Sequence, residues 1–477
     1  MIRKWLSRYS WRYPRSLVYM FQLSEYNIHD FWAWYKRTDD FSRVERRKQL
    51  EMTLKAVLLM VVALAMLTLS YLAVAVTLWF FASSYKYILF FIFVLVSPYL
   101  LAYELVVSLL MVKFFIQRPI EYFIIKKARQ RLQTHKAIRI GIAGSFGKTT
   151  MREILKTVLS EGKKVAAPPH SYNTMLGLSR FIMDLRGDEE VLIFELGEYY
   201  PGDVRRLCEL VRPQIGIITG VNEAHLEKFG SLDKTAGTIF ELADWLKESL
   251  IYVNGENKLA RENASARHLI YGRNGFGPWK VENAATDLTG TKFTLTRDGQ
   301  RLEVGSKLLG LHQIGPLVVA ADIANHLGIS LDKIKKGIEK TKSFDHRLEP
   351  RFDSSGVITL DDSYNGNPDG VRAVIEFLAS LKGHRRFYVT PGLVEMGPRL
   401  KEVHKEIGRN LAKAGIEKVV LIKNSVTGYI EEGLRESHYL GEVIWFNDGL
   451  SAFRALPHLT VKNDVVLLQN DWPDQYK

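Results

Sequence analysis

Cysteine is nearly absent from this chain: Cys208 is the only one among 477 residues. A single thiol cannot form an intrachain disulfide, and this usage fits a reducing compartment. Cys208 lies in the helical pattern DVRRLCELV, so we expect it to be a small packing residue. The N-terminal region also lacks an early apolar run of the signal-peptide type.

Charge is scarce in one long region and balanced in another. Residues 56–112 hold only two charged side chains, one of each sign, whereas residues 140–477 hold 44 basic and 44 acidic ones. The excess of basic residues lies beside the apolar region, with 12 basic against 6 acidic residues in 1–55 and 8 against 1 in 113–139. Such flanking charge indicates a membrane surface, and nucleic-acid binding by the neutral part, residues 140–477, has no electrostatic support.

The apolar region contains two runs that are long enough to cross a bilayer. Residues 56–81 carry no charge, and the second run, about 87–111, is interrupted by Pro98 and Glu104. About 20 apolar residues span the hydrocarbon core as a helix. We therefore predict a transmembrane hairpin over 56–116 with both ends in the cytoplasm, because both flanks are basic. The alternative is a pair of buried core helices in a soluble domain.

The segments around the hairpin are basic. Residues 1–55 are rich in aromatic and basic side chains, and QLSEYNIHDFWAWYKR could form an interfacial helix at headgroup level. A small soluble helical lead-in fits the same residues. Residues 117–137 read as a basic linker helix that leads away from the membrane surface.

A glycine turn between a strand and a helix begins the region after the linker. In IRIGIAGSFGKTT, residues 138–150, the first half is apolar and β-branched, and the following MREILKTVLSEG has helical period. Unpaired N–H groups and the dipole at a helix start attract phosphate, and glycine lets the backbone approach closely. We expect a nucleotide phosphate site at Gly144, Ser145, Phe146, Gly147, Lys148, Thr149 and Thr150.

Two of these side chains have defined tasks in such a loop. Lys148 would reach the β and γ oxygens, and the Thr149 hydroxyl would bind Mg²⁺. The motif is a short form, GxxGKT, because Ile142 stands where the standard pattern has its first glycine. The alternative is an ordinary strand–helix turn with a solvated lysine.

The alternation of strands and helices from residue 138 onward predicts an α/β fold. We expect a central P-loop domain with a mainly parallel sheet over 138–344, including a β-hairpin over 289–306 around its Asp-Gly turn. A smaller doubly wound α/β domain follows over 345–477.

Polar residues stand at the ends of several predicted strands or in the loops after them. In open α/β sheets ligands bind at these ends. Glu195 could hold Mg²⁺, His225 could be a second ligand, and Arg347 could clamp a phosphate. The alternatives are a solvated strand-end carboxylate for Glu195, a surface histidine for His225 and pairing with a nearby acid for Arg347. Asn173 is a further candidate whose alternative is a turn residue, and the candidate Asp362 ends the strand that opens the second domain.

Six motifs follow one another along residues 138–477: AGSFGKTT, SYNTMLG, FELGEYYPGDV, GVNEAHLEKFGSL, HRLE and DDSYNGNPDGVRAVI. This order resembles the Mur ligases, the ATP-dependent amide ligases of cell-wall peptide assembly. It is most similar to the branch that adds D-alanyl-D-alanine.

The resemblance implies a two-step reaction through an acyl phosphate, with ATP and Mg²⁺ as cofactors. It places one magnesium ion on Thr149 and Glu195 and a second on His225, and it brings Arg347 and Asp362 to ATP from the domain junction. Asn173 joins the nucleotide-binding residues, and Lys148, His225 and Arg347 are the catalytic candidates.

The chain also departs from the family pattern. A membrane hairpin stands where the family has its UDP-binding domain, and Ile239 stands where many members have a lysine that becomes carbamylated. On the adenine side, His312-Gln313 and Pro316 replace a His-Asn pair and a second Asn.

We therefore expect a membrane-anchored ligase with cytoplasmic catalytic domains. Its substrates would be a cell-envelope precursor, either soluble or lipid-linked, and an amino acid or dipeptide, with cell-wall synthesis proteins as partners. The alternatives are a nucleotide-binding membrane scaffold without turnover and a poly-γ-glutamate or lipid-linked-precursor amidating ligase.

Overall fold

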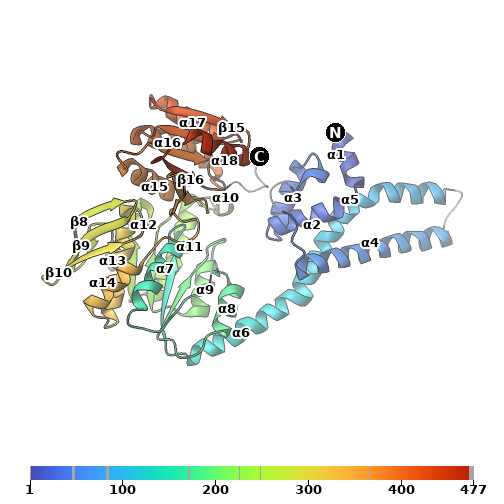
Figure 1. Ribbon diagram of the computed structural model, residues 1–477. Helices are drawn as coiled ribbons and strands as arrows, with labels where there is room; N and C mark the ends of the chain where they lie inside the picture. Colours follow the sequence, from blue (N-terminus) through green and yellow to red (C-terminus); the bar gives the residue numbers. More distant parts are fainter. Residues whose placement is uncertain are drawn as a thin grey trace. The chain divides into compact units, whose positions relative to one another are not determined.

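The computed structural model of this chain describes residues 2–45, 49–81, 85–169, 172–224, 226–247, 249–364 and 366–471. The chain divides between Phe123 and Ile124 into two compact units (Figure 1). The first unit is helical, and the second contains three β-sheets with their helices.

The first unit consists of a helical lead-in and a long hairpin. The aromatic residues of the lead-in form a core of its own, in which the rings of Phe21 and Phe31 stack at 3.8 Å between centroids. Its elements and those of the hairpin are α1 (Ile2–Leu6), η1 (Ser7–Tyr9), α2 (Tyr13–Leu23), α3 (Ile28–Arg37), η2 (Phe41–Arg43), α4 (Leu54–Phe81) and α5 (Lys86–Val112).

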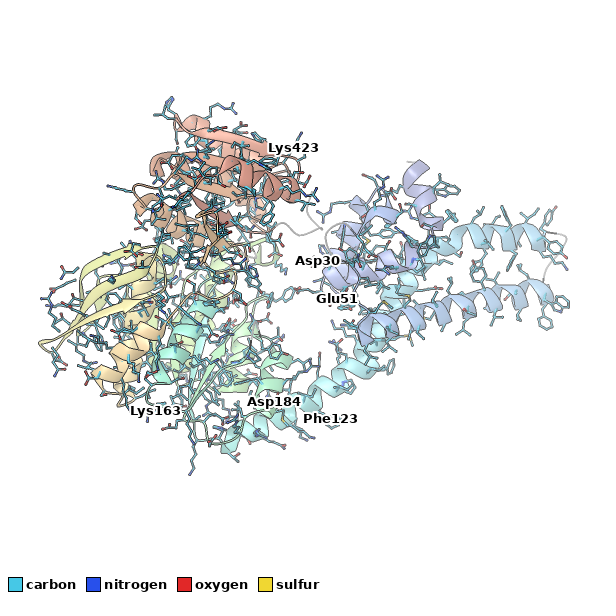
Figure 2. All side chains as sticks on the ribbon, in the orientation of Figure 1. Asp30, Glu51, Phe123, Lys163, Asp184 and Lys423 are labelled. Atoms are coloured by element: carbon cyan, nitrogen blue, oxygen red, sulfur yellow. The ribbon has the colours of Figure 1, made fainter. Side chains whose placement is uncertain are left out.

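The hairpin helices α4 and α5 are long, apolar and mostly exposed. Their most apolar windows have mean hydropathies of 2.6 and 2.1 and are only 11% and 22% buried, unlike helices of a soluble core. Figure 2 shows side chains standing outward along most of the hairpin. Between the helices, Ser70 Oγ donates to Glu104 Oε1 at 3.0 Å and Tyr71 OH donates to Ser97 Oγ at 2.7 Å. By length and composition, both helices can cross a membrane.

Beyond the hairpin, a short π-helical turn, η3 (Lys113–Gln117), leads into α6 (Arg118–Thr134). The second half of α6 belongs to the second unit, where Ala128 and Leu132 are buried in the core. The predicted basic linker is thus a helix whose end packs on the domain that follows.

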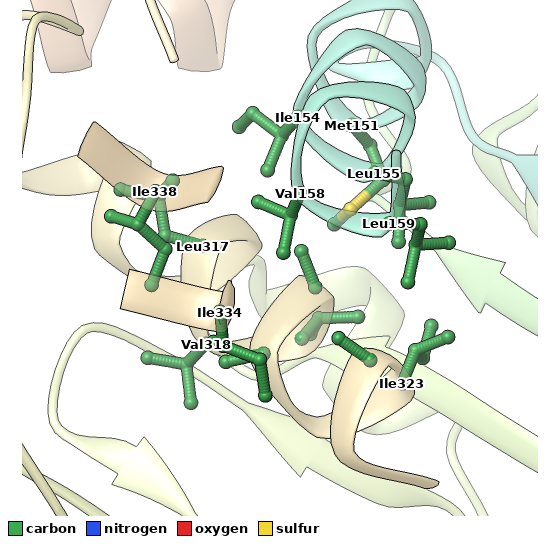
Figure 3. Packing of buried hydrophobic residues seen from close by; sticks show 14 of the residues in the cluster. Met151, Ile154, Leu155, Val158, Leu159, Leu317, Val318, Ile323, Ile334 and Ile338 are labelled. Atoms are coloured by element: carbon green, nitrogen blue, oxygen red, sulfur yellow. The ribbon is translucent and has the colours of Figure 1, made fainter. Parts of the chain in front are cut away.

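The second unit begins with a six-stranded sheet in which all neighbours are parallel, in the order β2-β3-β1-β4-β5-β6. One face packs on α7 and α13, where Met151, Leu155 and Val158 point toward Leu317 and Val318 (Figure 3), and α14 packs on α7 and α13. The strands are β1 (Ile138–Ala143), β2 (Val165–Ala166), β3 (Val191–Glu195), β4 (Ile215–Ile218), β5 (Leu250–Asn254) and β6 (Leu269–Tyr271).

Helices of this domain cover both faces of the sheet. The other face packs on α8, α9 and α11, and the interiors of both layers are mainly aliphatic with some aromatic side chains. The helices are α7 (Lys148–Leu159), α8 (Met175–Met183), α9 (Asp203–Val211), α10 (Leu226–Phe229), α11 (Leu232–Leu246), α12 (Lys258–Glu262), η4 (Leu311–Gln313), α13 (Ile314–His326) and α14 (Leu331–Lys340).

A four-stranded antiparallel sheet, β10-β9-β8-β7, lies beside this domain. The predicted hairpin is confirmed as its last two strands, and Asp298-Gly299 forms the turn with positive φ at both residues. The strands are β7 (Gly275–Phe276), β8 (Trp279–Asp287), β9 (Gly290–Arg297) and β10 (Gln300–Ser306).

The C-terminal sheet has the order β11-β12-β16-β13-β14-β15, and only the β11 pairing is antiparallel. This confirms the predicted α/β class with a doubly wound second domain. The elements are β11 (Glu349–Phe352), β12 (Ile358–Asp362), α15 (Pro368–Ser380), β13 (Arg386–Thr390), η5 (Gly397–Arg399), α16 (Leu400–Ala414), β14 (Lys418–Ile422), α17 (Thr427–Glu436), β15 (Glu442–Phe446), α18 (Gly449–Leu459) and β16 (Val465–Gln469).

Candidate active site

The glycine turn lies between β1 and α7, where the sequence places it. Gly144 has φ of +144° and Gly147 has φ of +74°, conformations that side chains with a Cβ rarely adopt. A Cβ at Gly144 would also collide with Thr219 at the end of β4. The Thr219 hydroxyl donates to the carbonyl of Phe146, and the N–H of Ser145 donates to the carbonyl of Gly220 at 2.9 Å. The end of the neighbouring strand therefore fixes the shape of the loop.

The ammonium of Lys148 is paired with a carboxylate that the sequence reasoning did not single out. Both oxygens of Glu198 lie 2.9 Å from Lys148 Nζ, which also donates to the carbonyl of Gly144. The side chains are 13% and 2% exposed, so the pair is almost fully buried. Glu198 stands three residues beyond Glu195, and that spacing is the only sequence signal that could have identified it.

Thr149 and Glu195 form a second polar contact beside the first. Thr149 Oγ1 donates to Glu195 Oε2 at 3.0 Å, and Arg152 Nη1 lies 2.7 Å from Glu195 Oε1. Burial raises the pKa of Glu195, and the cations of Arg152 and Lys148 partly oppose this rise. A hydroxyl and a carboxylate are hard oxygen donors of the kind that Mg²⁺ prefers, so these residues fit a magnesium ion at the loop.

A cavity of about 330 Å³ opens from the loop toward the C-terminal domain. Its walls combine backbone and side chains of both domains, including Gly147, Thr150, Tyr271, Arg347, Asp362 and Glu376. His312, Gln313 and Pro316, the predicted adenine-side residues, also line it. Burial lowers the pKa of His312 to about 4, so its imidazole is neutral at pH 7, and it lies 2.8 Å from the Gln313 amide nitrogen.

Arg347 and Asp362 both line the wall of this cavity. The guanidinium of Arg347 lies 4.7 Å from the ring centroid of Tyr364, and burial lowers its pKa while the carboxylate of Asp362 opposes this shift. Asp362 accepts from Gln469 Nε2 at 2.8 Å and from the N–H of Leu348 at 3.1 Å. Burial raises the pKa of Asp362. An arginine in this position presents a fork of donors suited to phosphate.

The central and C-terminal domains, both in the second unit, also contact each other around the cavity through polar side chains. Asn222 Nδ2 donates to Asn367 Oδ1 at 2.9 Å and to Asp369 Oδ2 at 3.0 Å. Arg273 bridges Glu256 of the central domain and Glu376 of the C-terminal domain, with N–O distances of 3.0 and 2.6 Å. These contacts hold the domains together over the cavity.

The remaining predicted residues have different places. The carbonyl of Asn173 accepts from the N–H of Gly197 at 3.0 Å, and Asn173 is absent from the cavity wall within the described residues. It therefore holds the strand end that carries Glu195. His225 lies outside the described residues. Ile239, at the expected position of the carbamylated lysine, is fully buried in the apolar core.

Comparison with known proteins places this arrangement in a family. The Mur ligase middle domain matches residues 142–324, and the Mur ligase glutamate ligase domain matches residues 346–469. The two matches together span more than half of the chain. The chain belongs to the Mur ligase family. Members of this family are ATP-dependent amide ligases.

Individual Mur ligases show the same relationship. UDP-N-acetylmuramoyl-tripeptide–D-alanyl-D-alanine ligase of Bacillus subtilis is 26% identical over 333 residues, which are 69% of this chain and 72% of that protein. The Escherichia coli ligase of the same name is 29% identical over 297 residues, 59% of this chain and 64% of that protein. The chain thus spans less than two thirds of the length of some relatives.

Solved Mur ligase structures share the fold of the second unit. MurF from Thermotoga maritima, in complex with ADP, has a TM-score of 0.65 at 25% identity. The superposition covers 74% of this chain and 80% of the MurF chain. MurF from Acinetobacter baumannii has a TM-score of 0.65 at 22% identity over 73% of this chain and 77% of its own.

Replacing Arg273 with methionine should raise the KM for ATP about fivefold and leave folding intact, because it removes the ion pairs that join the domains over the cavity. Arg409→Met is the matched control, since Arg409 also binds two carboxylates and is 33% exposed against 32% for Arg273, but both of its partners lie in the C-terminal domain. Steady-state kinetics with varied ATP measures the effect. Equal KM values for the two variants would contradict this role.

Proposed function

We propose that this Mur ligase joins an amino acid or dipeptide to the carboxylate of a peptidoglycan precursor at the cytoplasmic face of the membrane, using ATP and Mg²⁺. The observation that carries the proposal is the cavity between the two domains, which has the glycine loop at one end and Arg347 in its wall. The cell-wall substrates named for the similar ligases support the choice of precursor and amine.

The residues suit the reaction in two steps. A precursor carboxylate oxygen attacks the γ-phosphorus, ADP leaves, and an acyl phosphate forms. The amine then attacks the carbonyl carbon, inorganic phosphate leaves, and the amine loses a proton. Lys148 and Arg347 would neutralise the negative charge on the transferring phosphoryl group, and the contacts between the domains would exclude water from the acyl phosphate.

Magnesium would be held by Thr149 and Glu195, with His225 as a further candidate ligand. A magnesium ion held there would supply positive charge that offsets the negative charge of the ATP phosphates. Asp362, whose oxygens accept from Gln469 and Leu348, would orient Arg347 at the nucleotide.

Turnover by the full-length chain in detergent tests the ligase. Phosphate release should require ATP, D-alanyl-D-alanine and either a UDP-linked or a lipid-linked muramoyl peptide, and comparison of the two acceptors identifies the carrier. Nucleotide binding without turnover on both acceptors would favour the alternative of a nucleotide-binding scaffold. The buried Ile239, where many family members have a lysine, is the observation that keeps this second candidate.

Membrane attachment through α4 and α5 has its own test. Leu72→Arg together with Val76→Arg should move much of the full-length chain out of the carbonate-washed membrane fraction, because each arginine costs about 3 kcal/mol inside the hydrocarbon core. Both side chains are exposed, at 56% and 54%. The matched control is Leu450→Arg with Phe453→Arg, since these residues are 60% and 64% exposed on α18. Full retention of the hairpin variant would contradict attachment through this face.

A further inference from the structure

Glu198 is paired with Lys148, the lysine that directly follows the glycine turn. Its two carboxylate oxygens lie 2.9 Å from Lys148 Nζ, and Lys148 is the only partner of this carboxylate among the residues that the structure describes. Glu198 is almost fully buried. A phosphate that binds Lys148 must therefore share this space with a buried negative charge.

The backbone around Glu198 is fixed on both sides. On one side, the N–H of Gly197 donates to the carbonyl of Asn173 at 3.0 Å, and a Cβ at Gly197 would approach that oxygen to 2.7 Å. On the other side, the N–H groups of Tyr199 and Tyr200 donate to Asp203 Oδ2 at 3.2 and 2.8 Å. The loop thus has little freedom to carry Glu198 away from the site.

A buried carboxylate between phosphate oxygens is costly unless a cation is bound to it. Unpaired charges inside proteins are strongly destabilising, and like charges at contact distance repel. Lys148 alone cannot satisfy both a triphosphate and Glu198. A divalent cation that bridges the carboxylate and the phosphate removes this conflict, and Mg²⁺ prefers such oxygen donors.

The position where many family members have a carbamylated lysine offers no such charge in this chain. Ile239 is fully buried among the apolar side chains of α11 and the sheet. Glu198, by contrast, follows the same strand end as Glu195, whose carboxylate accepts from Thr149. Both carboxylates therefore meet adjacent residues of the glycine loop.

We propose that Glu198 is a metal-ligating residue of this chain: it pairs with Lys148 when no nucleotide is bound and binds a magnesium ion against the ATP phosphates when ATP takes Lys148. This inference rests on the proposed ATP-dependent function. In this chain Glu198 would supply the negative charge that a carbamylated lysine supplies in many family members, because position 239 carries no lysine.

The test compares ATP affinity of the full-length chain with and without Mg²⁺ by calorimetry. Glu198→Gln should raise the affinity for ATP in EDTA, because the repulsive charge is gone, and should lower the enhancement of affinity by Mg²⁺ about tenfold. Electron paramagnetic resonance should count one bound Mn²⁺ fewer per ATP than in the unchanged protein. Glu209→Gln, a 46% exposed carboxylate on α9, should change none of these values.

Glu198→Asp keeps the charge and should retain part of the coupling between Mg²⁺ and ATP, which separates ligation from damage to the fold. Two results would overturn the proposal. One is a Mn²⁺ count in Glu198→Gln equal to that of the unchanged protein, and the other is an ATP affinity that rises by the same factor in this variant with and without Mg²⁺. Either result would mean that Glu198 only competes with phosphate for Lys148. If the unchanged protein binds no nucleotide under any condition, the proposed function itself fails.

Discussion

Replacing Lys148 with methionine lowers ATP-dependent phosphate release by about 10³-fold, the scale of losing a cation that stabilises a transferring phosphoryl group. Lys148 begins α7 directly after the glycine turn, and its ammonium donates to the Gly144 carbonyl. It is thus held where the β- and γ-phosphates would lie. Phosphate release in the presence of both substrates measures the effect.

This single substitution also leaves a buried carboxylate without its cation. Breaking a buried ion pair by removing one partner costs about 3 kcal/mol, so Lys148→Met should melt at a lower temperature than the unchanged chain. The double variant Lys148→Met/Glu198→Gln removes both charges and should recover most of the melting temperature while turnover stays low. The recovery would show that lost turnover is a loss of chemistry and not of folding.

A surface lysine provides the control for charge alone. Lys163 pairs with Glu190 at 3.2 Å, and the two side chains are 29% and 47% exposed. Lys163→Met should therefore leave both turnover and melting temperature near their original values. Turnover above one tenth of the original in the double variant would show that Lys148 does not serve the reaction.

The glycine turn and its strand were predictable because their signals are local. A β-branched apolar run, two glycines and a helical period fall within one short stretch, and the backbone takes positive φ at Gly144 and Gly147. The short strands β2, β6 and β11 were not predicted, because two to four residues cannot show an alternation. They exist only through pairing with longer neighbours.

Partnerships between distant residues were beyond the reach of the sequence. Glu198 is 50 residues from Lys148, and Arg273 is 103 residues from Glu376. From the sequence alone, a charged residue in a loop is expected to be solvated, and only the fold shows which residue it pairs with. The motif order pointed to the domain junction as the site, but the Arg273–Glu376 pair across that junction depends on how the two domains pack.

The sequence pattern of the helical lead-in is compatible with two structural roles. Aromatic residues at helical spacing suit both a membrane interface and a small core, since either environment accepts an amphipathic helix. Within the first unit, Tyr13, Phe31 and Phe41 are fully buried against one another and against the base of the hairpin. A folded helical lead-in is therefore present, while its contact with lipid stays a prediction.

Replacing Arg347 with methionine should lower kcat/KM for ATP by about 10²-fold or more, because its guanidinium lies in the cavity wall and offers charged donors suited to a phosphate. Arg347→Lys keeps the charge but loses the planar fork, so it should recover only part of the activity. Initial rates over a range of ATP concentrations measure both variants. A loss confined to KM would indicate binding of the nucleotide alone, whereas a loss in kcat places the guanidinium on the transferring phosphoryl group.

Arg351 is the matched control, four residues along the chain. Its guanidinium lies 2.8 Å from both Glu349 and Asp361, and the side chain is 50% exposed, outside the cavity wall. Arg351→Met should change kcat/KM less than threefold, since exposed ion pairs contribute little. Equal effects of Arg347→Met and Arg351→Met on kcat/KM would indicate that the summed positive charge at the domain junction supports the reaction. In that case no single guanidinium would contact the phosphate. A difference of two orders of magnitude between them would instead place the phosphate beside Arg347, at the opening between the two domains.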